Sequence, residues 1–262
     1  MNRYASTVAL YARMNLIKVL AITLVTAAVA AFLVWRFPVG QEVQETYTDP
    51  VTQEEFVILS ERLGLNDVME GSYVPIVCGV GFAAIVAVMS LTGCGYGTKT
   101  DYTVRRLRVN ERGAVFLWAA YHTALLMVFW AVLAAVLFGM LTLRSGDVAE
   151  IPGLVYGPQS MLLLCYTDTF LHRLVPMRDG VVWVIDIVMV LVTALGTVKF
   201  SHSQRHGRFS IGVFLAVGCT VASCFCPMGN SWNYILLILA LVLGAVMCYT
   251  MWGGENDAEK PL

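Results

Sequence analysis

One polar stretch interrupts an otherwise apolar chain: SLTGCGYGTKTDYTVRRLRVNERGAVFLW, residues 90–118. It holds three alternating glycines and five basic residues, and a new apolar run begins at its end. The glycines have neither the G-x-G-x-x-G spacing of a dinucleotide site nor the spacing of a P-loop, and a long apolar segment precedes them instead of a short strand. We therefore interpret the glycines as the exit of a helix at a membrane surface.

The composition of the whole chain indicates the solvent in which it folds. Of its 262 residues, 58% are hydrophobic and 13% are charged, whereas soluble domains carry about 25% charged residues. The seven cysteines mostly lie inside apolar runs, where cysteine packs as a small hydrophobic residue. Their odd number and their absence from the loop at 37–72 do not fit a disulfide framework. The composition therefore predicts a membrane protein.

Six apolar stretches are long enough to cross a bilayer, whose hydrocarbon core of about 30 Å needs roughly 20 helical residues. They lie at about 15–36, 73–93, 114–142, 180–198, 211–228 and 234–252. The fifth is the shortest and the richest in small residues. We therefore predict an all-α, polytopic membrane protein with six transmembrane helices in a single domain over residues 1–252, followed by an acidic tail at 253–262.

The positions of lysine and arginine predict the orientation, because cytoplasmic loops carry an excess of both. With the N-terminus inside, twelve of the 17 basic residues lie on the cytoplasmic side. The first outer loop, 37–72, then carries eight acidic residues against one arginine. Both termini are therefore predicted to be cytoplasmic.

The first span has features of a targeting segment. Residues 1–31 have the basic start and the apolar run of a signal peptide. The run continues through Trp35 and five further spans follow, which favours an uncleaved signal-anchor helix. In the alternative, cleavage would remove the first span.

A short amphipathic helix is expected on the outer surface, within loop 37–72. A capping box begins at Thr52, and Phe56, Leu59 and Leu63 then follow at helical spacing. The alternative for this segment is a polar loop without a helix.

A second outer element is expected at 159–175, QSMLLLCYTDTFLHRLV. Its apolar residues are interrupted by Asp168, His172 and Arg173, and a charge at the middle of a membrane costs about 2.5–3.5 kcal/mol on insertion scales. We therefore predict an interfacial or re-entrant helix and not a seventh span.

The basic stretch itself is expected to form a short helix within the inner loop 94–113. Such a helix would lie along the membrane surface, with arginines that contact anionic lipid or a partner protein. The alternative is a topology signal without a partner. Nucleic-acid binding is not expected, since the orientation in the membrane already explains the basic residues. The candidate partner-binding residues are Asp101, Tyr102, Arg105, Arg106, Leu107 and Arg108.

Two ionisable residues inside spans are candidates for a polar pathway, because such residues commonly mark pathways and proton relays. Asp186 lies seven residues into the fourth span, at a depth of about 10 Å. His122 lies near the cytoplasmic end of the third span. The alternatives for Asp186 are packing against a neighbouring helix and a side chain that extends toward the outer surface.

Catalytic motifs are absent from the sequence. No Ser-His-Asp, H-E-x-x-H, paired-carboxylate or ATP-hydrolysing pattern is present. The sequence therefore predicts a protein that is not an enzyme and that has no metal site and no cofactor.

Two segments, GCGYGTKTDYTVRRLRVNERGAVFLW (93–118) and FLHRLVPM (170–177), resemble small permease subunits of the type-2 ABC transporter family from Gram-positive gut bacteria. In that family the inner loop between spans two and three docks on a separate ATP-hydrolysing subunit. The resemblance implies a coupling surface at Arg105, Arg106, Leu107 and Arg108, a second permease subunit of the same or another kind, and a multi-pass location in the bacterial cell membrane. The family has its re-entrant element between the last two spans, whereas the candidate element here precedes span four.

Three functions follow from these observations. The leading expectation is a permease subunit that moves an unknown substrate and is driven by a separate ATPase. The second is a membrane scaffold or regulatory subunit that does not transport. The third is a membrane enzyme that uses Asp186 or His122.

Overall fold

The computed structural model describes residues 3–48, 55–92, 111–149, 158–177, 180–205, 207–208, 210–226 and 230–253. Its helices are α1 (Arg3–Arg36), α2 (Asn66–Gly71), α3 (Val74–Thr92), α5 (Glu111–Ala149), α6 (Pro158–Thr167), α7 (Thr169–Leu174), α8 (Gly180–Arg205), α9 (Gly212–Phe225) and α10 (Asn230–Gly253). Its strands are β1 (Glu42–Thr48) and β2 (Glu55–Arg62).

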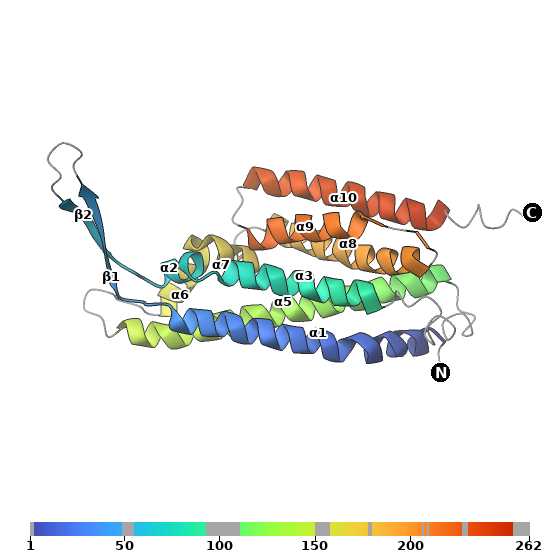
Figure 1. Ribbon diagram of the computed structural model, residues 1–262, viewed down its shortest axis with the longest axis horizontal. Helices are drawn as coiled ribbons and strands as arrows, with labels where there is room; N and C mark the ends of the chain where they lie inside the picture. Colours follow the sequence, from blue (N-terminus) through green and yellow to red (C-terminus); the bar gives the residue numbers. More distant parts are fainter. Residues whose placement is uncertain are drawn as a thin grey trace, which may run out of the picture.

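The long helices form one elongated bundle (Figure 1). Helix α1 packs against α3 and α5, and α8 packs against α3, α5, α9 and α10. The chain begins at the same end of the bundle at which α10 ends, and α3, α8 and α9 also meet this end (Figure 1). We call it the terminal end. The short helices α2, α6 and α7 lie toward the other end, which we call the hairpin end (Figure 1).

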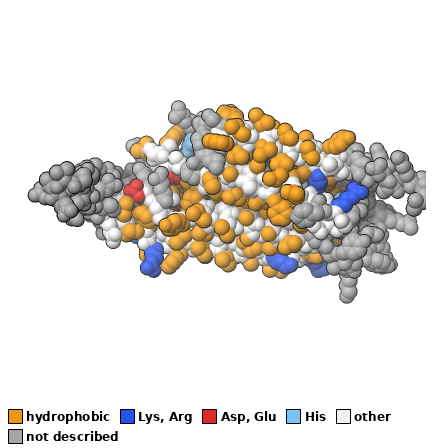
Figure 2. Space-filling view, turned by 45° about the horizontal axis from the view of Figure 1, so that its top comes forward, with side chains coloured by type: hydrophobic (Ala, Val, Ile, Leu, Met, Phe, Trp, Pro, Cys, Tyr) orange, Lys and Arg blue, Asp and Glu red, His pale blue; other side chains and the backbone are white. Residues whose placement is uncertain are grey.

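Apolar side chains explain why these helices associate with one another and with lipid. Each of the six expected apolar stretches overlaps one of the helices α1, α3, α5, α8, α9 and α10. Orange hydrophobic side chains cover the middle of the described surface, and lysine and arginine lie toward its two ends (Figure 2). This distribution is that of a body surrounded by hydrocarbon and bordered by polar headgroups.

Five helices are long and apolar enough to cross a membrane: Ala12–Arg36, Val74–Thr92, Gly113–Gly146, Gly180–Gln204 and Trp232–Met251. The multi-pass helical character is thereby confirmed for the described residues. The fifth expected span lies in α9, which has 14 residues. At 1.5 Å per residue it is about 21 Å long, shorter than the hydrocarbon core. The six-span topology and its orientation stay predictions.

Glycines allow close approach between neighbouring helices. A Cβ atom added to Gly81 on α3 would lie 2.4 Å from the Oγ1 atom of Thr26 on α1. A Cβ atom added to Gly196 on α8 would lie 3.2 Å from the Cα atom of Val213 on α9. The hydrophobic effect does not drive helices together within lipid, so membrane helices associate through close van der Waals packing. Small residues at such crossings allow this packing.

The prediction of an amphipathic helix in loop 37–72 was wrong. Residues 55–62 form β2, which pairs antiparallel with β1 from Glu42↔Arg62 to Thr48↔Glu55, with an irregularity after Glu45. The capping-box signal is local, whereas the strand obtains its hydrogen bonds from a separate segment, β1. The hairpin projects beyond the helical body (Figure 1).

Candidate functional site

Helix α7 and the residues around it form the candidate site, at the hairpin end. Segment 159–175 contains two short helices that separate at Asp168, in place of the single helix expected. Asp168 is the N-cap of α7, and its Oδ1 atom accepts a hydrogen bond from the backbone N–H of Leu171 at 2.6 Å. Phe170, Leu171 and Leu174 are buried, whereas Thr169 is exposed, so one face of α7 packs against the apolar body.

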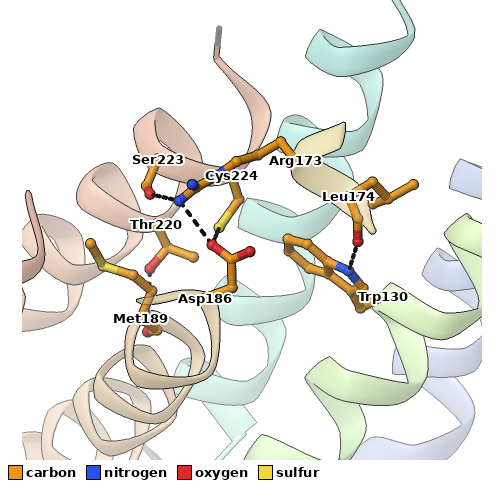
Figure 3. A network of polar contacts seen from close by, with 8 residues as sticks. All are labelled: Trp130, Arg173, Leu174, Asp186, Met189, Thr220, Ser223 and Cys224. Carbon is orange, nitrogen blue, oxygen red and sulfur yellow. Dashed lines mark hydrogen bonds and ion pairs between the residues drawn. The ribbon is translucent and has the colours of Figure 1, made fainter. Parts of the chain in front are cut away.

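Two tryptophans hold the end of α7 in place. The Nε1 atom of Trp130 on α5 donates to the carbonyl oxygen of Leu174 at 2.8 Å (Figure 3). The Nε1 atom of Trp183 on α8 donates to the carbonyl oxygen of Pro176 at 2.7 Å. Carbonyls at the end of a helix have no partner within it, so these indoles satisfy groups that would otherwise be buried without hydrogen bonds.

A buried ion pair joins α7 to α8. The Nη2 atom of Arg173 lies 2.9 Å from the Oδ1 atom of Asp186, and the two side chains are 11% and 7% exposed. The same Nη2 atom donates to Ser223 Oγ at 2.6 Å, and the thiol of Cys224 donates to Asp186 Oδ1 at 3.6 Å (Figure 3). Three elements, α7, α8 and α9, therefore meet around one carboxylate, which explains how a charge is tolerated inside the apolar body.

Further polar contacts follow α8 toward the terminal end. Thr193 Oγ1 lies 2.7 Å from Thr220 Oγ1 on α9, and Thr220 also donates to the carbonyl oxygen of Ala216 at 2.9 Å. Thr197 Oγ1 lies 2.7 Å from His122 Nδ1 on α5. All three threonines and His122 are fully buried.

The structure does not bring the two predicted pathway residues together. Asp186 and His122 are both buried, but His122 contacts α8 at Thr197, eleven residues beyond Asp186. Eleven helical residues correspond to about 16 Å. The residues proposed for partner binding (Asp101, Tyr102, Arg105, Arg106, Leu107 and Arg108) lie outside the described residues.

Sequence reasoning missed Arg173 as the partner of Asp186. The available signal is general, since ionisable residues inside membranes commonly pair with one another, but Arg178 lies nearer to Asp186 in the sequence than Arg173 does. Within the described ranges, no group of three or more His, Cys, Asp or Glu residues is placed to hold a metal ion.

The groups around Asp186 determine what the site can do chemically. Asp186 and its neighbours offer a carboxylate, a guanidinium, hydroxyls and a thiol in a buried setting. Such an arrangement can bind water, move a proton or hold helices together. No protein-family model, no curated protein and no solved structure matches the chain.

Proposed function

We propose that the protein is a permease-like subunit of an ABC transporter, which couples to a separate ATPase through the loop at 94–113. The observation that supports this proposal is the position of the two helix ends that flank that loop. Helix α3 ends and α5 begins toward the terminal end of the bundle, where α10 also ends (Figure 1). The described helix ends that flank residues 93–110 thus share this end, and the five basic residues of 94–113 favour its being the cytoplasmic side.

The α7 element supports transport in a second way. Helix α7 is held by its buried side chains Phe170, Leu171 and Leu174, by two indole hydrogen bonds near its end, and by the contacts of Arg173 with Asp186 and Ser223. We take α7, which has six residues, as the element whose position changes during transport. In the proposed mechanism, ATP binding by the partner acts on the loop at 94–113 and changes the packing of the helices that enclose α7.

Purification from native membranes in a mild detergent tests the proposal. A tagged chain is expected to co-purify with a protein that carries a Walker A motif and hydrolyses ATP. Replacing Arg105, Arg106 and Arg108 together by glutamate should lower this hydrolysis severalfold, because the loop surface changes sign. Arg208→Glu is the matched control, since Arg208 is an exposed arginine between α8 and α9 at the terminal end.

Two results would overturn the permease proposal. The first is a purified complex without ATP hydrolysis. The second is a triple variant that keeps its partner and hydrolyses ATP at the rate of the Arg208→Glu control.

A membrane scaffold or regulatory subunit is the second candidate. It is favoured by the internal pairing of the polar side chains: Arg173 with Asp186, Thr193 with Thr220, and His122 with Thr197. Polar pairs of this kind hold membrane helices together and need no moving part. In this case the co-purified partner would hydrolyse no ATP.

A further inference from the structure

Four polar residues lie on one side of α8 and form what we call the polar face: Asp186, Thr193, Thr197 and Ser201. With 3.6 residues per turn, they fall within about 80° of one another around the helix axis. They extend over 15 residues, or about 22 Å of helix. All four are buried, with Asp186 5% exposed and the other three 0%.

The polar face carries buried atoms that need a further hydrogen-bonding partner. Asp186 Oδ2, His122 Nε2 and Ser201 Oγ have no partner among the described residues. An unsatisfied buried polar atom costs about 1–3 kcal/mol, and internal water molecules commonly satisfy such groups. Near each end of the polar face and beside His122, these atoms are therefore the positions at which a water molecule would find a hydrogen-bonding partner.

His122 is oriented to accept a proton. The hydroxyl of Thr197 donates to the carbonyl oxygen of Ala194 at 2.7 Å. Its oxygen can therefore only accept a hydrogen bond from the His122 imidazole ring. Nδ1 of His122 is then the N–H donor across the 2.7 Å contact to Thr197. In a neutral imidazole this leaves Nε2 as the acceptor, and Nε2 is the unsatisfied ring atom.

Other titratable, polar and aromatic groups surround the polar face. Near Asp186 the neighbouring charged and titratable groups are Arg173 from α7 and Cys224 from α9. Between Asp186 and Thr197 the hydroxyls of Thr193 and Thr220 are in contact, and a hydroxyl both donates and accepts hydrogen bonds. Around His122 the ring neighbours are Trp118 and Tyr121.

We propose that the polar face of α8 transfers protons between Asp186 and Ser201, through hydroxyl groups, His122 and bound water. A proton enters at one end as a hydronium ion and leaves at the other, and each hydroxyl on the route gives up one proton as it receives another, so no group is consumed. This inference does not depend on an ATPase partner.

Proton flux into liposomes tests it. The purified full-length chain is placed in vesicles that contain a pH-sensitive dye, and a potassium gradient with valinomycin drives protons across the membrane. The wild-type chain should raise the rate above that of protein-free vesicles. Thr197→Val should lower this added rate at least fivefold, because it removes the hydroxyl that holds His122, whereas Thr197→Ser should keep it.

The matched control is Thr23→Val. Thr23 is a buried threonine of α1 that donates to the carbonyl oxygen of Val19 at 2.8 Å, so this variant loses the same hydroxyl away from the polar face and should conduct as the wild type does. His122→Gln keeps hydrogen bonding but has no ring nitrogen that can take up one proton as the other gives one up, and it should conduct as poorly as Thr197→Val. A wild-type rate equal to that of protein-free vesicles, or a Thr197→Val rate equal to that of Thr23→Val, overturns the proposal.

Discussion

Arg173 and Asp186 are bound to each other at 2.9 Å although they belong to different helices, and both side chains are close to fully buried. The pair also carries unsatisfied atoms, since Arg173 Nε and Asp186 Oδ2 have no partner among the described residues. Each charge is thus compensated mainly by the other. This dependence makes the pair the most sensitive point of the α7 element.

Loss of one partner should therefore destabilise the protein more than loss of both. Arg173→Met leaves Asp186 without its counter-charge and should lower the free energy of unfolding by about 3–5 kcal/mol, whereas Arg173→Met with Asp186→Leu should recover most of that loss. Unfolding by sodium dodecyl sulfate in mixed micelles measures both. Equal losses in the single and double variants would show that the pair is not mutually compensating.

The cap of α7 gives a second prediction. Asp168→Ala removes the acceptor for the N–H of Leu171 and should cost about 0.5–2 kcal/mol of stability. Asp168→Asn keeps a side-chain oxygen and should retain most of it. Protease cleavage between α6 and α7 is the measurement, since loss of the cap should make this junction open more often. Equal cleavage of the two variants would contradict the capping role.

Much of the fold was predictable because long apolar runs are strong signals. The expected stretch at 73–93 became α3 at Val74–Thr92, and the stretch at 180–198 lies in α8. Features that depend on distant partners were not predictable. The segment at 55–62 is a strand only because β1 pairs with it, and Asp168 was interpreted as an interruption of one helix although it begins the next.

The same distinction applies to the candidate site. Asp186 and His122 were found from the sequence because ionisable residues stand out in apolar runs. Their partners were not found, since Arg173 and Thr197 reach them only after α7, α5 and α8 have packed. Spacing along one helix cannot show which neighbour faces a given side chain.

Two glycine substitutions should have opposite effects. Gly81→Ala places a methyl group 2.4 Å from Thr26 Oγ1 and should cost about 1–3 kcal/mol by overpacking. Gly139→Ala on α5 has nothing within 4 Å of the added Cβ atom and should gain up to about 1 kcal/mol from helix propensity. Detergent unfolding of the two variants against the wild type measures the difference. A Gly81→Ala variant as stable as Gly139→Ala would mean that α1 and α3 do not pack closely.

The orientation can be tested with one native thiol. Cys226 is exposed and follows α9 toward the hairpin end, which the charge distribution predicts to be outside. In intact cells, a membrane-impermeant maleimide should label a variant in which Cys226 is the only cysteine. A variant that keeps only Cys94, from the predicted inner loop, should be labelled only after the cells are opened. The reverse pattern would invert the topology.

The shortness of α9 has a consequence for the surrounding lipid. Its 14 residues are about 21 Å long, and its exposed side chains include Phe214 and Leu215. If α9 crosses the membrane, acyl chains beside it must compress or tilt, because a short span is accommodated by local thinning of the bilayer. The protein should then be more stable in lipids with shorter acyl chains, and bilayer thickness would act on the helix that carries Ser223 and Cys224.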